Sequence, residues 1–136
     1  MRPLVSIGIP TFHRPWLLEK ALSSVVNQTY KELDILVSDN CSDGCLAYQA
    51  VNKFNDSRIK YVRQEKRLDV NENFFYTREN TKSQDFFMWL GDDDFISDTY
   101  IENCINAFKK EGGLASVGTE IQYYTRNGGI LPTFRE

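Results

Sequence analysis

Short, mostly apolar runs, of which the first is rich in β-branched residues, alternate along this chain with segments whose apolar residues recur at helical spacing. The runs have the length of strands and lie at residues 4–9, 33–37, 59–63 and 86–90. The helical segments lie between and after them, at residues 15–27, 46–54, 73–81 and 99–110. Parallel strands need crossover connections, which are usually helical. The alternation therefore predicts an α/β fold with a mostly parallel sheet and right-handed crossovers.

The same pattern predicts the positions of individual elements. The run at 86–90 is the most apolar and is expected to form a central, buried strand. The helix at 99–110 has one apolar face that includes Cys104, which predicts a core position for this cysteine. Residues 114–119 are expected to form another strand, and residues 121–125 and 130–134 flank an Asn-Gly-Gly sequence typical of a hairpin.

Size and composition narrow the classes of protein. A chain of 136 residues has the size of one domain, so a single domain over residues 1–136 is expected. The formal net charge is -3, whereas duplex-binding domains are usually basic, so no nucleic-acid partner is expected. No apolar stretch approaches the roughly 20 residues that span a bilayer. Because no secretory leader opens the sequence either, the expected location is cytoplasmic.

The cysteines do not form a zinc motif. Cys41, Cys45 and Cys104 have only His13 to complete a ligand set, and their spacing does not match that of structural zinc sites. Reduced cysteines that act as small apolar residues are the better interpretation.

The candidate functional residues follow the strands. Ligands of open α/β sheets bind outside the carboxyl ends of the strands. The segments just after three predicted strands should therefore meet at one edge, and they contain Pro10, Thr11 and Phe12, then Asp39 and Asn40, and finally Asp92, Asp93 and Asp94.

Two phosphate-binding motifs are missing from these segments. Neither Gly-x-Gly-x-x-Gly nor Gly-x-x-x-x-Gly-Lys occurs, which argues against a dinucleotide oxidoreductase and a P-loop protein. Three adjacent aspartates could instead hold Mg²⁺ or Mn²⁺, which shares its ligands between carboxylates and phosphates. Alternatively, residues 92–94 form a solvated turn before the next helix, where acidic residues are stabilising. The apolar strand before them and the position at the ligand-binding edge favour the cation.

Four motifs in chain order resemble those of family-2 glycosyltransferases. Residues 5–15 resemble the family's opening strand followed by Pro-Thr-Tyr-Asn-Arg, and residues 21–30 are similar to its helix ending in Ser-Val-x-x-Gln-Thr-Tyr. Residues 36–44 resemble Val-Asp-Asp-Gly-Ser-Thr-Asp-Gly, and residues 86–94 resemble the strand that carries the Asp-x-Asp motif. The resemblance implies the GT-A fold, a Rossmann-like three-layer sandwich of nucleotide-diphospho-sugar transferases.

The resemblance also implies an activity. It is the metal-dependent, inverting transfer of a sugar from a nucleotide-diphospho-sugar, with a UDP-sugar as the expected donor. The acceptor would be a hydroxyl of a glycan or a lipid-linked molecule, in glycan or cell-surface polysaccharide synthesis. A lipid-linked acceptor would bring the full-length enzyme to the inner face of the membrane.

Roles for the nucleoside pocket are implied in the same way. Pro10, Thr11 and Phe12 would line the pocket, with Phe12 placed near the base, and Asp39 would form a hydrogen bond with the base. The structural alternatives are a core aromatic for Phe12 and an Asx-turn for Asp39. Arg67 and residues 71 and 73, both asparagines, could approach the nucleotide, although a solvated charged face is the better default for Arg67.

The acidic run would serve the diphosphate. Asp92 would lie near the ribose and the diphosphate, Asp93 would be the principal ligand of Mn²⁺ or Mg²⁺, and Asp94 would lie beside it. Gly91 stands where many family members have the first aspartate, which leaves the division of roles within this run open. His13 and Ser38 also replace residues that are usual in the family, an asparagine and an aspartate.

The catalytic base of the family lies well after the Asp-x-Asp strand, and no matching acidic motif follows here. Glu120 and Glu136 are isolated, so the base is not identified and the acceptor-binding part is expected to be missing. Three other functions stay open: a non-catalytic nucleotide-sugar binding module, a sugar-nucleotide nucleotidyltransferase, and an interaction domain with a surface acidic turn.

Overall fold

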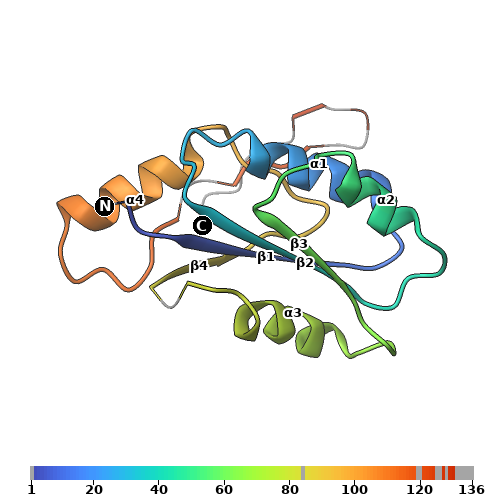
Figure 1. Ribbon diagram of the computed structural model, residues 1–136. Helices are drawn as coiled ribbons and strands as arrows, with labels where there is room; N and C mark the ends of the chain where they lie inside the picture. The colour runs from blue at the N-terminus through green and yellow to red at the C-terminus, as the bar shows by residue number, and fades with distance from the viewer. Residues whose placement is uncertain (1, 84, 119–120, 125–126, 128, 131–136) are drawn as a thin grey trace. The chain divides into compact units, whose positions relative to one another are not determined.

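The computed structural model describes residues 2–83, 85–118, 121–124, 127 and 129–130 (Figure 1). The chain divides into two compact units, Met1–Glu102 and Asn103–Glu136. The single domain expected over residues 1–136 stays a prediction. No helix in the described part of the chain has the length and the hydrophobicity to cross a membrane.

The first unit contains a four-stranded sheet in the order β3-β2-β1-β4. The strands are β1 (Val5–Thr11), β2 (Leu33–Asp39), β3 (Ile59–Arg63) and β4 (Phe86–Trp89). All three pairings are parallel. The register aligns Val5 with Leu33 on one side of β1 and with Phe86 on the other.

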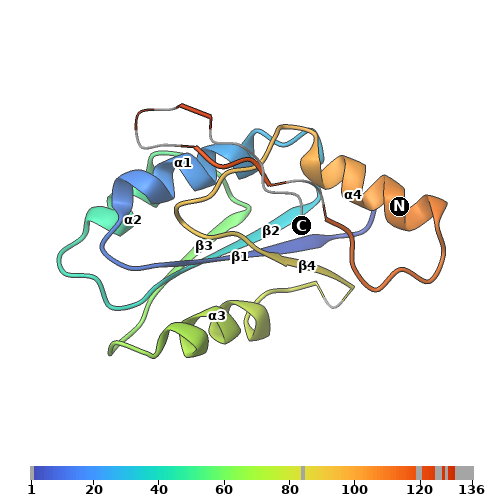
Figure 2. The same cartoon turned by 180° about the vertical axis from the view of Figure 1, so that it is seen from behind.

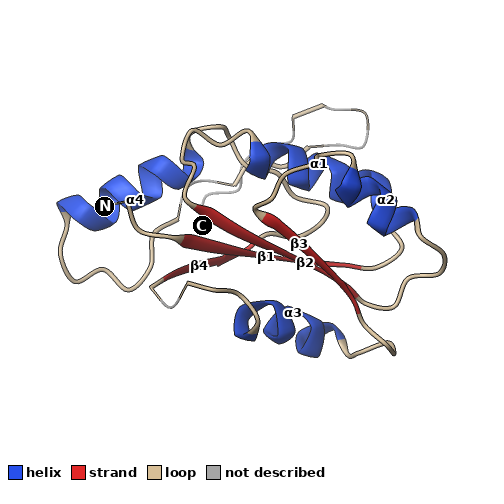
Figure 3. Cartoon of the chain, in the orientation of Figure 1, coloured by secondary structure: helices blue, strands red, loops and turns tan. Residues whose placement is uncertain are grey.

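Helices cover both faces of this sheet. Helices α1 (Pro15–Val26) and α2 (Leu46–Asn52) lie on one face, and α3 (Val70–Glu79) lies on the other (Figures 2 and 3). The fourth helix, α4 (Tyr100–Lys110), begins in the first unit and continues into the second. The three layers and the parallel sheet confirm the predicted α/β sandwich.

The elements form for local reasons that the sequence contains. Strands β1 and β2 are buried along their whole length, as expected for strands covered on both faces. Helix α1 has Pro15 in its first turn, where the missing N–H costs nothing. Helix α3 begins with a capping box. The Asp69 side chain accepts a hydrogen bond from the main-chain N–H of Glu72, and the Glu72 side chain accepts one from the main-chain N–H of Asp69.

Gly8 is the point where β1 approaches α3 most closely. A Cβ atom placed on Gly8 would lie 2.3 Å from Thr77 Oγ1 and 2.7 Å from Thr77 Cβ. The hydroxyl of Thr77 in turn accepts a hydrogen bond from the Trp89 indole N–H, 3.2 Å away. Only glycine leaves room for the helix at this distance, so position 8 sets the spacing between sheet and helix.

The prediction of a central strand at 86–90 was wrong. Strand β4 lies at the end of the described sheet and is half-buried, with Trp89 43% exposed. Its apolar side chains pack among aromatic rings instead, because Trp89 contacts Phe74, Phe75 and Phe87 at centroid distances of 6.3, 6.3 and 5.1 Å. Aromatic clustering at a sheet edge thus accounts for the hydrophobicity of the run.

Predictions for the second unit were confirmed in part. Helix α4 is present, but Cys104 is half-buried because it lies beside the buried line of Ile101 and Ile105. The prediction of a strand here was wrong, because residues 114–118 form no strand and Leu114 is exposed. Tyr124 and Ile130 form an antiparallel bridge, as the hairpin prediction requires. Residues 125, 126, 128 and 131–134 of the predicted hairpin, with residue 119 and Glu120, lie outside the described residues.

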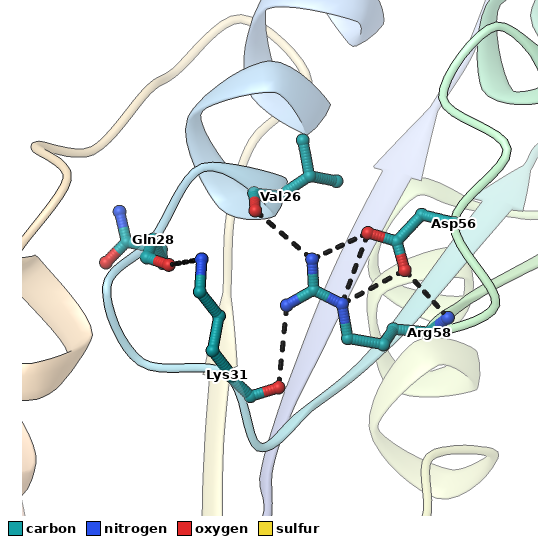
Figure 4. Close-up of polar contacts among 5 residues, drawn as sticks. All are labelled: Val26, Gln28, Lys31, Asp56 and Arg58. Atoms are coloured by element: carbon teal, nitrogen blue, oxygen red, sulfur yellow. Dashed lines mark hydrogen bonds and ion pairs between the residues drawn. The ribbon is translucent and has the colours of Figure 1, made fainter.

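Arg58 joins the end of α1 to the loop before β3 (Figure 4). Its guanidinium donates to the carboxylate of Asp56 at 2.6 Å and to the main-chain oxygen of Val26 at 3.1 Å. A further contact reaches the main-chain oxygen of Lys31 at 3.5 Å, while the Lys31 ammonium donates to the Gln28 carbonyl. The half-buried guanidinium therefore provides a donor for the Val26 carbonyl, one of the carbonyl groups that the end of a helix leaves without a partner inside the helix.

Candidate functional site

The carboxyl ends of the strands bring the predicted residues together. Thr11 is aligned with Asp39 in neighbouring strands, and Pro10 is buried beside Ser38. The chain after β4 stays next to β1, since the Leu90 N–H donates to the Gly8 carbonyl at 3.0 Å. The three segments singled out in the sequence therefore meet at one edge, as expected.

Asp92 is the buried centre of this edge, with only 1% of its surface exposed. Its Oδ2 atom accepts a hydrogen bond from the Thr11 hydroxyl at 2.7 Å. Its Oδ1 atom lies 2.7 Å from Arg14 Nη2 as an ion pair, but it accepts no hydrogen bond of good geometry from the described residues. Burial raises the pKa of Asp92, while the Thr11 hydroxyl and the Arg14 charge act in the opposite direction.

Asp93 and Asp94 lie on the exposed side of the same turn. Arg14 reaches Asp93 as well, with Nη1 3.1 Å from Asp93 Oδ2. Partial burial of its carboxyl group and the neighbouring charge of Asp93 raise the pKa of Asp94. A Cβ atom placed on Gly91 would lie 2.9 Å from Asp94 Oδ2 and 3.0 Å from Asp93 Oδ1. Two carboxylate oxygens therefore converge on the side-chain-free face of this glycine.

These oxygens fit the chemistry of a hard divalent cation. Mg²⁺ is commonly held by one or two carboxylates, with substrate phosphates and water as the other ligands. The described residues contain no group of three or more acidic, histidine or cysteine side chains placed to hold a metal. Asp93 and Asp94 nevertheless supply the two-carboxylate arrangement, and their mutual repulsion would be relieved by a cation.

Asp39 is fully engaged with its own surroundings. It is 1% exposed, its Oδ1 atom accepts from the Ser42 N–H at 3.0 Å, and its Oδ2 atom accepts from the Tyr61 hydroxyl at 2.7 Å. Burial and this hydrogen bond raise the pKa of Tyr61. Asp39 therefore has a structural role in its loop, as the alternative predicted, although its bond reaches the N–H three residues on instead of the two of an Asx-turn, and contact of Asp39 with a base stays a prediction.

Phe12 is half-buried at the edge rather than in the core. The guanidinium of Arg67 lies 4.5 Å from the centre of its ring, and the His13 ring packs against it edge-on at 4.2 Å. Arg67 is thus exposed, as its default interpretation predicted, but it also covers a candidate site residue. His13 is exposed in the left-handed region with φ 55, and its Nε2 atom lies 3.6 Å from Asp43 Oδ2.

The asparagines of α3 have structural roles. The Asn71 N–H donates to Asp69 in the helix cap, and Asn73 is buried beneath the edge, where it exchanges hydrogen bonds with Ser38. Sequence reasoning assigned no role to Arg14 or Tyr61. Arg14 belongs to the Pro-Thr-Tyr-Asn-Arg-like motif, which could have drawn attention to it, whereas only the fold brings Tyr61 to Asp39.

Comparison with known proteins gives a consistent result. Residues 6–133 match the family described as "Glycosyl transferase family 2". The GalNAc(5)-diNAcBac-PP-undecaprenol beta-1,3-glucosyltransferase of Campylobacter jejuni is 37% identical over 68% of this chain and 30% of its own length. The chondroitin synthase of Escherichia coli is 27% identical over 95% of this chain and 19% of its own. The chain therefore spans less than a third of the length of these relatives.

Solved structures share the fold. S. aureus TarS in complex with UDP has a TM-score of 0.71 and 19% identity, over 79% of this chain and 32% of that one. The mannosyltransferase PcManGT from Pyrobaculum calidifontis, in complex with GDP-Man and Mn²⁺, has a TM-score of 0.68 and 17% identity, over 79% and 33%. The predicted GT-A fold is confirmed by these neighbours.

Proposed function

The chain belongs to glycosyl transferase family 2, and we propose that it carries the nucleotide-sugar-binding part of an enzyme that transfers a sugar to an acceptor hydroxyl. The donor in this proposal is a nucleotide-diphospho-sugar, taken as a UDP-sugar. Transfer inverts the configuration at the anomeric carbon of the sugar. The names of the two bacterial relatives support a role in polysaccharide or lipid-linked glycan synthesis. The UDP bound in TarS supports the choice of nucleotide.

One observation carries the proposal most directly. A buried carboxylate, that of Asp92, is held by Thr11 and Arg14 at the edge of the sheet where α/β proteins bind ligands. Burying a charged group is costly unless it is paired. The paired, buried carboxylate of Asp92 lies next to the carboxylates of Asp93 and Asp94. This arrangement supports binding of a polar ligand at this edge of the sheet.

The nucleoside would lie against the ends of β1 and β2. We assign Pro10, Thr11 and Phe12 to its pocket, with Phe12 beside the base and Asp39 as its hydrogen-bonding partner. Support comes from the half-buried ring of Phe12, which already has a planar guanidinium 4.5 Å from its centre. Aromatic faces that accept a guanidinium also suit a nucleic acid base.

The diphosphate would lie over the acidic turn. Asp92 would face the ribose and the diphosphate, while Asp93 and Asp94 would hold Mn²⁺ or Mg²⁺. When bound, such a cation stabilises the negative charge that grows on a departing diphosphate. The protein's own contribution is to hold the carboxylates in place, and no described residue is proposed as the base for the acceptor hydroxyl.

Calorimetric titration of the 136-residue chain with UDP and GDP, each with and without Mn²⁺, tests the proposal. Mn²⁺ is expected to strengthen UDP binding. In Asp93→Ala the affinity for UDP in the presence of Mn²⁺ should fall to the value measured without the metal, because the main cation ligand is lost.

Asp98→Ala is the matched control, because it removes an exposed carboxylate four residues beyond the acidic turn. It should keep the effect of Mn²⁺. If neither nucleotide binds, or if Asp93→Ala responds to Mn²⁺ as the unmodified chain does, the assignment of the site is wrong.

A further inference from the structure

Arg14 connects two carboxylates of the acidic turn with two different nitrogens. Its Nη2 atom lies 2.7 Å from Asp92 Oδ1, and its Nη1 atom lies 3.1 Å from Asp93 Oδ2. The planar guanidinium presents its donors as a fork, so that one side chain can serve both partners at once. This contact spans from the loop after β1 to the turn after β4.

The two contacts differ in their surroundings. Asp92 has a side chain that is 1% exposed and is also held by Thr11, so its pairing with Arg14 is part of the packed structure. The side chain of Asp93 is 54% exposed and that of Arg14 is 46% exposed. Exposed ion pairs contribute little to stability. The contact with Asp93 can therefore be exchanged for another partner, while the contact with Asp92 persists.

The charges of the turn leave room for one divalent cation. Three adjacent carboxylates carry three negative charges when ionised, and Arg14 compensates one of them. Asp93 Oδ1 and Asp94 Oδ2 lie on the same face of Gly91, so Asp93 Oδ1 stays available to a cation while Oδ2 is paired with Arg14. A cation at this position would lie near the positive charge of Arg14 and would be repelled by it.

We propose that Arg14 is a positioning residue that acts as the resident counter-ion of Asp93 and opposes cation binding there until a diphosphate is present. The inference rests on the proposed function, in which Asp93 holds the cation. A diphosphate is an anion for which arginine is a good partner. When it arrives with the cation, Arg14 can exchange its contact with Asp93 for a contact with a phosphate oxygen. The cation alone would then bind weakly, and cation and diphosphate would strengthen each other's binding.

Titration of the 136-residue chain with Mn²⁺ alone, followed by the electron paramagnetic resonance signal of free Mn²⁺, tests this inference without any turnover. Arg14→Gln is expected to bind Mn²⁺ about tenfold more tightly than the unmodified chain, because both a competing partner and a repelling charge are removed. Lys20→Gln removes the same charge from an exposed site on α1 and should leave the affinity unchanged. Addition of UDP should strengthen Mn²⁺ binding less in Arg14→Gln than in the unmodified chain.

The outcomes distinguish failure of the role of Arg14 from failure of the proposed cation site. If the unmodified chain binds Mn²⁺ and Arg14→Gln binds it equally or more weakly, the role of Arg14 is refuted and the cation site stands. If no variant binds Mn²⁺, even with UDP or GDP, both proposals fail. If circular dichroism shows that Arg14→Gln is unfolded, Arg14→Lys decides. It keeps the charge but loses the fork, so a smaller gain in affinity is expected and the absence of any gain overturns the inference.

Discussion

Replacement of Arg58 by alanine should destabilise the fold far more than the loss of an ordinary surface arginine. The side chain donates to the Asp56 carboxylate and to the main-chain oxygens of Val26 and Lys31. Hydrogen bonds to charged groups contribute about 1.5–3 kcal/mol each. The side chains of Arg58 and Asp56 are 23% and 17% exposed, which favours the lower part of that range. With the helix-end contact included, we expect Arg58→Ala to lower the free energy of unfolding by about 3 kcal/mol.

Urea denaturation followed by tryptophan fluorescence and far-ultraviolet circular dichroism measures this change. Lys53→Ala is the matched control, since Lys53 pairs with Glu19 at a site where its side chain is 63% exposed. Such surface pairs contribute about 0.2–1 kcal/mol. The loss of unfolding free energy in Arg58→Lys should fall between the losses in these two variants. An ammonium group keeps the charge but cannot reach all the acceptors that the guanidinium contacts. A loss in Arg58→Ala no larger than that in Lys53→Ala would refute the reasoning.

The same pair predicts a dependence on pH. The hydrogen bond from Arg58 is the largest cause of the lowered pKa of Asp56. A carboxylate with a folded-state pKa below its unfolded value stabilises the fold fully above the unfolded pKa, and this contribution is lost as the pH falls through the folded value. The stability gap between the unmodified chain and Asp56→Asn should therefore be constant at neutral pH and close in acid, below the ordinary value of 3.8. A gap that widens on acidification would contradict this account.

Two further substitutions test the packing of the sheet and its edge. Gly8→Ala should cost about 3 kcal/mol, because its Cβ would lie 2.7 Å from Thr77 Cβ, and thermal unfolding of Gly8→Ala with Thr77→Gly should show partial recovery. If the double variant recovers no stability, contact between the new Cβ atom and Thr77 is not the cause of the loss in Gly8→Ala. Tyr61→Phe should lower stability by about 1 kcal/mol in urea denaturation, through loss of the bond to Asp39. It should also weaken UDP binding if Asp39 contacts the base, and an unchanged stability would show that this bond contributes nothing.

Most elements of the fold were predictable because their signals are local. Pro15 opens α1 at the predicted residue, and strand β3 has the predicted bounds. The position of β4 was not predictable in this way. The sequence pattern of an apolar run is the same in a central strand as in an edge strand that packs its aromatic rings against a helix. The distinction depends on Trp89 and its partners from α3, which the periodicity of β4 does not contain.

The candidate site was predictable at the level of segments but not of side chains. Parallel strands end at one edge, so the meeting of Thr11, Asp39 and Asp92 follows from the topology. That Asp92 is buried while Asp93 is exposed depends on the path of the turn after β4. The roles of Arg14 and Tyr61 depend on contacts between side chains from different strand ends, which no spacing along the chain encodes.

The hydrogen bond between Thr11 and Asp92 joins residues 81 positions apart in the chain. Closing an unstructured loop of that length costs about 4 kcal/mol of chain entropy beyond a constant, from the logarithmic dependence on length. A chain that has folded only its first strands thus has no partial form of this site. The site is complete only once β4 has aligned beside β1, so a translating ribosome must release β4 before any ligand can bind there.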